Sequence, residues 1–526
     1  MEFIKTEGKI LVTDSGKPIL LRGFGLGGWL LPEGYMWKLF TQCDRPRRME
    51  KLIEGLCGEE YAAEFWKRYF SGYITIRDVE LIAREGFNCV RLPMNARHLD
   101  DQNFGRIDAL ISWCKEWDIY VILDMHGAPG GQTGTNIDDS EDDTPRLFIE
   151  ERYQDELVEL WRSLAKRYAG EPAVAGYDLL NEPLPNWSSE YNPLLMPLYR
   201  RITSAIRTED KRHLIILEGV HWATDWSVFE ELAEHPPDDN LMLQFHKYWN
   251  IPDSESIAPY TAMREKLGVP IFMGEGGENN LEWYAGLFSM LESENISWSF
   301  WSYKKMDCGN SPVSFPRPSQ WDKIIAFIDG GAALAEEAAR GIFNEFLQNL
   351  TFKDYVNKPV LCAIKHEAPL TLPAEYFSGC HVTRERIPGA ALRLKTPVDI
   401  RFVNGKTGEP DYKRYGGEEQ PEEERLCVAL RAGEWLQYDF STIEEGGWLI
   451  KILCKPEAGP ANLTVQLDGL RPTVLHAPEE WGETALEFLM LKKGAHRLKI
   501  QATNSLLLRN WSIEHSPVSS QIPPPA

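Results

Sequence analysis

The distribution of apolar and polar residues divides the chain into two regions with different periodicities. Up to about residue 330, short apolar runs alternate with longer stretches in which apolar residues recur at helical spacing. In the stretch 153–170, one helical face carries Leu157, Leu160, Trp161, Leu164 and Tyr168. From about residue 375 the helical spacing disappears, and short runs of alternating apolar and polar residues replace it. The pattern predicts an α/β region followed by an all-β region.

Eight apolar runs of the first region are predicted to be strands separated by helices. They occupy residues 19–28, 88–94, 120–127, 174–183, 213–220, 241–249, 270–277 and 296–304. Eight buried strands that alternate with amphipathic helices indicate a parallel (β/α)8 TIM barrel rather than an open, doubly wound sheet. A dinucleotide-binding sheet is further disfavoured, because no helix is predicted to begin directly after the glycine-rich residues 23–28.

Two of these strands run directly into a carboxylate. Residues 174–180 lead into Asn181 and Glu182, and residues 270–274 lead into Glu275. The C-terminal ends of barrel strands converge on one mouth, so the two carboxylates are expected to face each other across a shared cleft. Hydrolysis of a glycosidic bond requires at least two opposed carboxyl groups, one as acid and the other as nucleophile or base.

Several motifs along residues 15–330 resemble glycoside hydrolase family 5, whose members are retaining β-glycosidases with catalytic acids on strands four and seven. The segments RGFGLGGWLLPE (22–33) and HGAPGGQTG (126–134) are similar to the exo-β-glucanase-like members, and NCVRLPM (88–94) resembles the family's second strand. The remaining matches are Asn181-Glu182-Pro183, His246-x-Tyr248, Glu275 within GEGG and Trp301 on the eighth strand. The resemblance implies an enzyme that acts on β-linked oligosaccharides or glycosides and requires no cofactor.

Glu182 and Glu275 carry the catalytic roles in this prediction. Glu182 is expected to be the general acid/base, which needs a pKa raised by burial and by a second carboxylate. Glu275 is expected to be the ionised nucleophile and needs a fixed cation or donor beside it. Arg91, at the end of the second strand, offers a permanently charged fork of donors. We therefore expect Arg91 within hydrogen-bonding reach of Glu275, and the two carboxyl groups ~5–5.5 Å apart.

Five further residues are expected to support the reaction. Asn181 would hydrogen-bond the sugar 2-hydroxyl, an interaction that strengthens in the transition state. His246 and Tyr248, at the end of the sixth strand, would orient Glu275 and the acid/base. Trp301 offers a flat apolar face for the reacting sugar, and His126 offers a hydrogen-bonding edge. Taken singly, such histidines are more often satisfied structural groups, and it is the resemblance that favours the functional interpretation.

Other residues of the predicted loops give weaker signals. Of the tryptophans there, about two or three are expected to touch ligand and the others to pack in the core: Trp29, Trp37, Trp222, Trp249 and Trp283. The acidic residues 138–143 are interpreted as a solvated loop rather than a calcium site. No metal site is predicted, because the sequence contains neither an HExxH nor a CxxC motif.

Composition disfavours several classes of partner. The formal charge of the 526-residue chain is −23, which argues against nucleic acid and anionic membrane surfaces. No apolar run approaches the ~20 residues that span a bilayer. The N-terminal MEFIKTEGKI lacks the features of a secretory signal, and the nine cysteines show no paired spacing. The chain is therefore expected to be cytoplasmic, or secreted if a signal has been removed; its oligomeric state is not predicted.

The second region predicts an antiparallel β-sandwich of jelly-roll type. Its expected strands are residues 426–432, 434–440, 447–455, 461–469, 485–492 and 494–503. The phrases AGEWLQYDF and KKGAHRLKI resemble lectin-like modules that accompany polysaccharide-degrading enzymes. A carbohydrate-binding module and a domain that buttresses the barrel both remain open, and the second is favoured.

The predicted domains are a catalytic barrel at 1–365 and a sandwich, carbohydrate-binding-module-like, at 366–526. Residues 357–373 are expected to cross between them and, being apolar rather than Gly/Ser-rich, to hold them together. The polar, Gly-rich residues 405–425 are expected to form a long solvent-exposed loop, and an alternative in which this loop leans toward the barrel mouth is left open.

These observations predict a two-domain retaining β-glycosidase. An exo-acting β-glucosidase or β-1,3-glucanase-like activity is favoured, because the third loop, about 25 residues from His126, is long enough to close one end of a cleft. An endo-acting β-glucanase (cellulase) or β-mannanase is the alternative. A barrel that binds sugar without catalysis is disfavoured, because Glu182, Glu275, Asn181 and Arg91 are all present.

Overall fold

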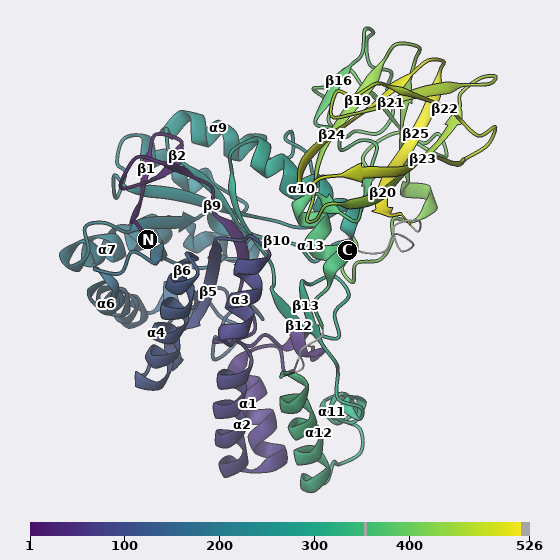
Figure 1. Cartoon of the computed structure of the whole chain (residues 1–526). Coiled ribbons are helices and arrows are strands. Elements are labelled where there is room, and N and C mark those ends of the chain that lie inside the picture. Colours follow the sequence, from purple (N-terminus) through teal and green to yellow (C-terminus); the bar gives the residue numbers. More distant parts are fainter. Residues whose placement is uncertain (41, 352–354, 517–526) are drawn as a thin grey trace, which may run out of the picture. The chain divides into compact units, whose positions relative to one another are not determined.

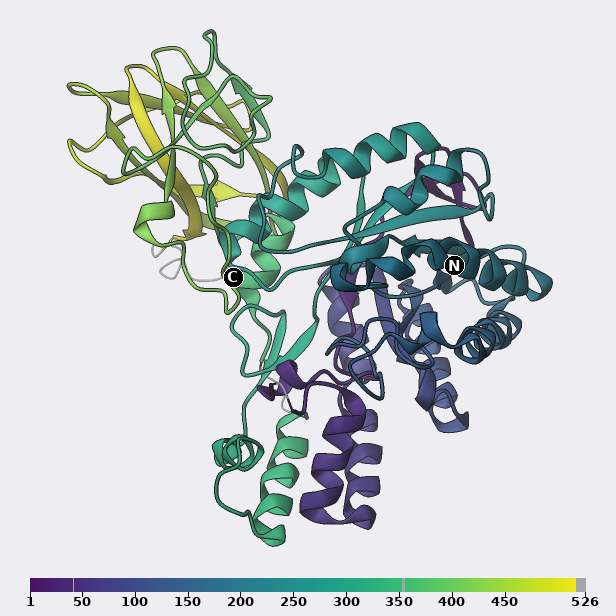
Figure 2. The same ribbon diagram turned by 180° about the vertical axis from the view of Figure 1, so that it is seen from behind.

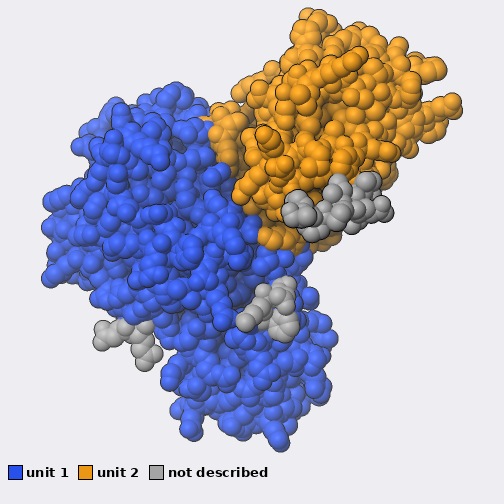
Figure 3. All heavy atoms as spheres, in the orientation of Figure 1, with its two compact units in different colours: residues 1–248, 259–277, 295–356 blue, residues 249–258, 278–294, 357–526 orange. Residues whose placement is uncertain are grey.

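The structure, a computed structural model, describes residues 1–40, 42–351 and 355–516. Internal contacts divide the chain into two compact units, which Figure 3 colours separately. The first unit comprises residues 1–248, 259–277 and 295–356, and the second comprises residues 249–258, 278–294 and 357–526. The predicted domain boundary after residue 365 stays a prediction; the contacts group residues 357–365 with the second unit.

The first unit is built on a closed barrel of eight parallel strands (Figures 1 and 2), in the order β10-β11-β4-β5-β6-β7-β8-β9. All eight predicted strands are present, which confirms the predicted TIM barrel. Their bounds are β4 Arg22–Gly25, β5 Cys89–Asn95, β6 Tyr120–Gly127, β7 Val174–Asp178, β8 Leu214–Glu218, β9 Leu241–Lys247, β10 Ile271–Gly276 and β11 Ser297–Phe300.

Helices of the first unit alternate with these strands and cover the outside of the barrel (Figure 1). They include α3 Ile76–Arg84, α4 Asp101–Glu116, α6 Glu151–Tyr168, α7 Leu195–Glu209 and α9 Ala258–Leu267, whereas α11 Trp321–Ile328 packs on α12 Glu336–Asn349 through Trp321 and Phe346. Helix α3 begins where the sequence favours it, because Thr75 and Asp78 form a capping box. Short helices α5 Arg146–Ile149 and α8 Val220–Ala223 lie in the loops that follow β6 and β8.

Three helices outside the barrel pattern pack together in the first unit: α1 Pro46–Cys57, α2 Glu59–Gly72 and α12 Glu336–Asn349 (Figures 1 and 2). Aromatic side chains hold this group, with the rings of Trp37 and Phe346 4.4 Å apart. A hairpin of β1 Ile4–Glu7 and β2 Ile10–Thr13, with β3 Pro18–Ile19, precedes the barrel, and β12 Lys304–Met306 pairs with β13 Val313–Phe315 after it.

The second unit contains two sheets, which confirm the predicted β-sandwich. One sheet has the order β14-β19-β24-β21-β22 with β16 beside β19; the other has the order β17-β18-β25-β20-β23 with β15 beside β25. The bounds are β14 Glu367–Ala368, β15 Leu370–Pro373, β16 Gly379–His381, β17 Asp399–Phe402, β18 Leu426–Leu430, β19 Trp435–Thr442, β20 Gly446–Pro456, β21 Asn462–Leu467, β22 Thr473–His476, β23 Gly482–Leu491, β24 Gly494–Ala502 and β25 Leu506–His515.

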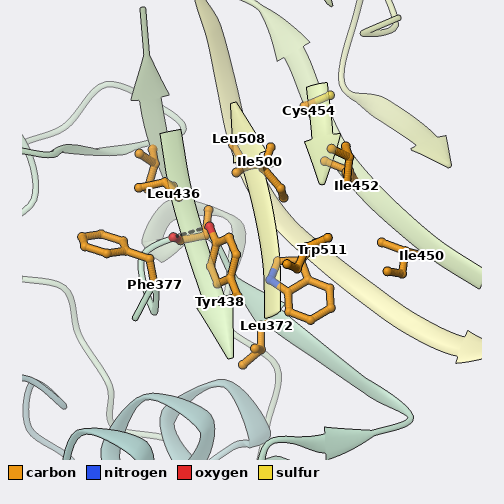
Figure 4. Close-up of a cluster of buried hydrophobic side chains, with 14 of the residues drawn as sticks. Leu372, Phe377, Leu436, Tyr438, Ile450, Ile452, Cys454, Ile500, Leu508 and Trp511 are labelled. Carbon is orange, nitrogen blue, oxygen red and sulfur yellow. Dashed lines mark hydrogen bonds between the residues drawn. The ribbon is translucent and has the colours of Figure 1, made fainter. Parts of the chain in front are cut away.

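Alternate residues of the sandwich strands form its core. Figure 4 shows Tyr438 of β19 beside Trp511 of β25, with ring centroids 5.5 Å apart. The hydroxyl of Tyr438 donates to the carbonyl of Ala374 at 2.8 Å, so the one polar atom of this ring is satisfied inside the core. The predicted strands account for much of both sheets, but β25, which lies at the centre of the second sheet, was not predicted.

Two segments of the second unit differ from the expectations. Residues 357–373 contain helix α13 Lys358–Lys365 and strand β15 rather than a plain crossing segment. Residues 405–425 are not simply exposed, because the loop folds around the backbone carbonyl of Asp411. Arg414 and Gln420 both donate to that carbonyl, at 3.0 and 2.9 Å, and both are buried.

The nine cysteines all lie in the described residues and all are free thiols. No helix in the described part of the chain combines the length and apolar character needed to cross a membrane.

Candidate active site

Glu182 and Glu275 lie at the same mouth of the barrel. Glu275 belongs to β10, where a register shift after Met273 pairs it with His246 of β9, and Glu182 lies in the turn after β7. Both are largely buried, with 8% of Glu182 and 4% of Glu275 exposed. Nδ1 of His246 lies 2.6 Å from Glu182 Oε1 and 3.5 Å from Glu275 Oε2. One carboxylate oxygen of each glutamate lies within 4.8 Å of the other.

Arg91 of β5 is fully buried and binds Glu275 directly. Its Nη1 donates to Glu275 Oε1 at 2.6 Å, and its Nε donates to Asp178 Oδ2 at 2.8 Å. Its Nη2 donates to Asn181 Oδ1 at 2.8 Å and to Glu218 Oε1 at 2.9 Å. The predicted contact between Arg91 and Glu275 is therefore present, and the catalytic role of Arg91 stays a proposal. A rigid guanidinium fork can serve these partners at once, whereas a lysine ammonium on a flexible stem cannot.

Buried carboxyl groups outnumber the cations around Arg91. Asp124 of β6 also approaches it, at 3.2 Å, and joins Asp178, Glu218 and Glu275. Burial raises the pKa of Asp124 to about 8 and that of Asp178 well above its ordinary range, although Arg91 opposes both shifts. Burial thus favours the neutral forms of Asp124 and Asp178.

The two candidate histidines have opposite charge states. Burial lowers the pKa of His126 to about 4, so its ring is neutral near pH 7. Burial also disfavours the charge of His246, but Glu275, Glu218 and Glu182 outweigh it and raise the pKa of His246 well above its ordinary value. His246 is therefore a cation between the two glutamates. Burial raises the pKa of Glu275, and the positive charge of His246 opposes that rise.

Tyr248 and Asn181 complete the contacts around the glutamates. The hydroxyl of Tyr248, which follows β9, donates to Glu275 Oε2 at 2.8 Å. Asn181 accepts from Arg91, and its Nδ2 lies 3.4 Å from Nε2 of His126. A phenol, a guanidinium and a nearby imidazolium thus surround Glu275, and all three favour its ionised form.

Trp301, directly after β11, lies flat beside His126. Their ring centroids are 5.3 Å apart and their planes differ by 7°. Its indole Nε1 donates to the hydroxyl of Tyr35 at 2.9 Å. Two glycines make room for the ring: a Cβ on Gly25 would come within 2.6 Å of its Cε3, and one on Gly27 within 2.7 Å of its Cη2. The glycines of the first-strand motif therefore have a steric function at this site.

Neighbouring segments fix the turn that carries Glu182. Glu182 has φ of 42°, in the left-handed region that residues other than glycine rarely adopt. Its N–H donates to Glu218 Oε2 at 2.7 Å, and the N–H of Asn181 donates to the carbonyl of Met125 at 3.1 Å. Gln132 closes the turn from the third loop, because its Nε2 donates to the Asn181 carbonyl at 3.0 Å.

Comparison with known proteins assigns the barrel to a family. Residues 57–307 match the model of "Cellulase (glycosyl hydrolase family 5)". This range contains the candidate residues from Arg91 to Trp301. This part of the chain, residues 57–307, belongs to glycosyl hydrolase family 5. It is therefore a glycoside hydrolase with the retaining mechanism of its clan, and its substrates are β-linked carbohydrates.

Named family 5 relatives differ in what they act on. "Beta-xylosidase" of Phanerodontia chrysosporium is 28% identical over 347 residues, which cover 58% of this chain and 71% of that protein. "Endoglucanase C" of Acetivibrio thermocellus is 26% identical over 310 residues, which cover 46% of this chain and 88% of that protein. "Probable glucan 1,3-beta-glucosidase A" of Aspergillus fumigatus is 29% identical over 241 residues, which cover 44% of this chain and 57% of that protein. Family membership alone therefore does not select a substrate.

The sequence patterns did not single out several residues of the family 5 site. Asp178 and Glu218 are the last residues of β7 and β8, so the signal that identified Glu275, an apolar strand that ends in a carboxylate, was also available for them. Gln132 carried no such signal, because its role depends on how the third loop folds.

The acidic residues 138–143 do not form a plain solvated loop, which corrects the expectation. Asp138 and Asp139 are buried, and Asp138 accepts backbone N–H groups of its own loop. Asp139 Oδ2 accepts from Arg97 Nε at 2.6 Å and from Asn95 Nδ2 at 2.9 Å. Protein donors thus take the place of water around these carboxylates.

Burial separates the candidate tryptophans. Trp29, Trp37 and Trp283 are buried core residues, whereas Trp222 and Trp249 are partly exposed. Trp187, which sequence reasoning missed, is 65% exposed in the loop that follows Glu182.

Proposed function

We propose that this family 5 enzyme is an exo-acting β-glycosidase with β-glucosidase or β-1,3-glucanase-like activity, in which Glu275 is the nucleophile and Glu182 the acid/base. One observation carries the assignment of roles. Glu275 is held by Arg91 and Tyr248, while an oxygen of Glu182 lies within 4.8 Å of it. An inverting pair would stand ~6.5–9.5 Å apart to admit a water molecule.

The reaction follows as a double displacement. Glu275 attacks the anomeric carbon while Glu182 gives its proton to the leaving oxygen, so a glycosyl ester forms on Glu275 and the leaving group departs as an alcohol. Glu182, now ionised, takes a proton from water, whose oxygen attacks the anomeric carbon and releases Glu275. Two inversions at one carbon give net retention.

The remaining candidates bind the substrate or support Glu275. Arg91 and Tyr248 hold the carboxylate in its ionised form and aim it. Asn181 receives the sugar 2-hydroxyl, Trp301 supports the apolar face of the reacting sugar, and neutral His126 offers a hydrogen-bonding edge.

The loops after the first three strands support exo action. Buried Arg45 donates to Ser140 Oγ at 2.7 Å and to Asp143 Oδ1 at 2.8 Å, and so joins the first loop to the third. Arg97, after the second strand, donates to Asp139 of the third loop at 2.6 Å. Charged hydrogen bonds thus join three loops into one wall, which suits a cleft closed at one end. An endo-acting β-glucanase or β-mannanase is the second candidate, and the similarity to an endoglucanase favours it.

Variants of the two glutamates test the roles. We expect Glu275→Gln to lower turnover by about 10⁴-fold or more, because no other group replaces the nucleophile. Glu182→Ala should regain activity with azide on substrates that have good leaving groups. Glu171→Gln, before β7 at the opposite end of the barrel, is the matched control and should behave like wild type. Near-normal turnover of Glu275→Gln would place the nucleophile elsewhere.

Product analysis tests the mode of attack. A panel of nitrophenyl β-glycosides identifies the sugar, and NMR of the first product shows whether the anomeric configuration is retained. On a soluble β-glucan, an exo enzyme releases a single sugar from the first minutes and hardly lowers viscosity. A ladder of oligosaccharides with a rapid fall in viscosity would replace the exo proposal with the endo alternative.

A further inference from the structure

Trp187 and Trp222 form an aromatic pair on two loops at the catalytic mouth. Trp187 lies in the 3-10 helix η3 Asn186–Leu194 that follows β7, and Trp222 lies in α8 after β8. Their ring centroids are 5.8 Å apart with planes at 65°, an edge-to-face contact. Because Trp187 remains 65% exposed, this contact leaves much of its indole surface accessible.

The two loops are attached to the turn of the acid/base. Trp187 follows Glu182 by five residues, and Trp222 follows Glu218 by four. Glu218 accepts the N–H of Glu182 at 2.7 Å, and the N–H of His221 donates to the carbonyl of Leu184 at 2.9 Å. The aromatic pair is therefore tied through short backbone links to the residue that protonates the leaving oxygen.

The backbone before and after Trp222 is strained. His221, Trp222 and Ala223 have φ of 53°, 61° and 60°, three consecutive left-handed residues without a glycine. Left-handed backbone is unfavourable for residues other than glycine, and such strain concentrates at functional sites. Among the described residues, Nε2 of His221 is buried and has no hydrogen-bond partner.

We propose that Trp187 and Trp222 form the subsite for the leaving group and that this subsite takes a pyranose ring. The inference rests on the proposed function, because the group protonated by Glu182 departs on the side of the Glu182 loop. A pyranose has an apolar face that stacks on an indole, and much of the Trp187 indole is accessible. The natural substrate is then a β-linked oligosaccharide rather than the glycoside of a lipid or other apolar alcohol.

The test compares two substrates that share the reacting sugar. A β-linked disaccharide fills the leaving-group subsite with a pyranose, whereas the corresponding glycosyl fluoride has only a fluoride there. For Trp187→Ala we expect the ratio of kcat/KM for the disaccharide to kcat/KM for the fluoride to fall by about 10–100-fold, the size of a lost aromatic stack. Trp187→Phe should retain most of that ratio.

Trp117→Ala is the matched control, because Trp117 is also exposed, at 46%, but lies in the turn before β6 at the opposite end of the barrel. Its ratio should equal that of wild type. Equal losses on both substrates, or no loss on either, would overturn the subsite. A loss confined to an octyl glycoside would overturn the choice of a pyranose. If wild type cleaves neither substrate, the proposed function fails as well, whereas an unchanged ratio in Trp187→Ala rejects only the subsite.

Discussion

At the scale of single residues, Glu218 is the least expected member of the site. Its carboxylate accepts the backbone N–H of Glu182, binds Nη2 of Arg91 and receives the side-chain amide of Gln244. It does not face the position of the reacting bond through any of these contacts, so we regard it as a positioning residue. In a glutamine at this position, the side-chain NH2 group would replace one carboxylate oxygen. A donor would then face the guanidinium of Arg91 or the backbone N–H of Glu182, which are donors themselves.

We expect Glu218→Gln to lower kcat by about 10²–10³-fold with little change in KM, since the acid/base and nucleophile lose their alignment rather than their binding of sugar. The charge of Glu218 also contributes to the raised pKa of His246, so that pKa should fall in the variant. Kinetics and histidine NMR measure the two effects. A rise in KM at constant kcat, or an unmoved His246, would show that Glu218 acts only structurally.

The charge states of the two histidines give a second prediction at this scale. Between pH 5.5 and 8 in ¹⁵N NMR spectra, we expect His246 to stay protonated and His126 to stay neutral, because their pKa values are shifted in opposite directions. For His126 the folded pKa of about 4 lies below the unfolded value of ~6.5. The unfolded state therefore binds more protons in this window, and the stability contributed by neutral His126 is lost as pH falls from 6.5 to 4. Titration of His126 near pH 6.5 would contradict the burial argument.

At the scale of elements, strand β4 and the two residues after it make room for Trp301, the proposed platform of the reacting sugar, because they carry glycines there. The backbone of Gly25 and Gly27 lies against the ring of Trp301, at distances that leave no space for a Cβ. Tyr35 also holds the Trp301 ring through a hydrogen bond, and His126 holds it through a stacked contact. It cannot simply rotate away without losing a hydrogen bond and a stacked neighbour.

Gly25→Ala and Gly27→Ala should therefore displace Trp301 and lower kcat/KM by about tenfold or more, with a loss of stability of about 1–3 kcal/mol from overpacking. Gly55→Ala in α1 is the control, because a Cβ there meets nothing within 4 Å and alanine favours a helix. Kinetics and thermal unfolding compare the three variants. Wild-type activity in both Gly25→Ala and Gly27→Ala would remove the steric role of the glycines.

At the scale of the whole molecule, the second unit includes helix α10 Leu281–Ser293 as well as the sandwich. Within this unit α10 contacts α13 and β15, and Nε2 of His366 lies 2.6 Å from the carbonyl of Ala285. Gly286 lies against the ring of Tyr376, where a Cβ would come within 2.5 Å. A chain shortened to residues 1–365 retains α10 but loses His366, Tyr376 and β15.

We expect this shortened chain to be poorly soluble or unstable, because it exposes apolar surface of α10 and α13 that the sandwich residues cover. Expression, size-exclusion chromatography and thermal unfolding of the two lengths provide the measurement. A soluble and fully active shortened chain that had merely lost adsorption to an insoluble glucan would favour a carbohydrate-binding module over a stabilising domain.

A buried carboxyl in the second unit should make stability depend on pH. Burial raises the pKa of Glu375 to about 8, against ~4.3 for an unfolded glutamate. The folded state then binds more protons between these values, so stability falls as pH rises from 4.3 to 8. Glu375→Gln removes this penalty and should stabilise the chain by ~2–5 kcal/mol at pH 9 but hardly at pH 4.

Thermal unfolding at pH 4, 6 and 9 measures this effect. Glu385→Gln, at an exposed position of the same unit, is the control and should show no pH-dependent gain. A gain of Glu375→Gln that is equal at all three pH values would mean that packing, not ionisation, accounts for the difference.

The local pattern of apolar and polar residues was sufficient to predict the architecture and the site residues that lie at the ends of apolar strands. The barrel strands are continuous apolar runs between amphipathic helices, and strand ends in a barrel share one mouth, so the pattern alone brings Glu182, Glu275 and Arg91 together. The sandwich strands followed from period-two alternation. Strand β25 was missed although it alternates as well, because nothing local shows that residues 506–515 lie between β18 and β20.

Tertiary structure decided what depends on partners far apart in the chain. It buried Trp29 and Trp283 but exposed Trp187, and it surrounded Asp139 with donors where local polarity suggested solvent. It also shifted the pKa values of the carboxyls around Arg91, because a pKa responds to burial and to charges that several strands bring within a few ångströms. The sequence gives the type of each residue, but the packing of the chain determines its charge state and its neighbours.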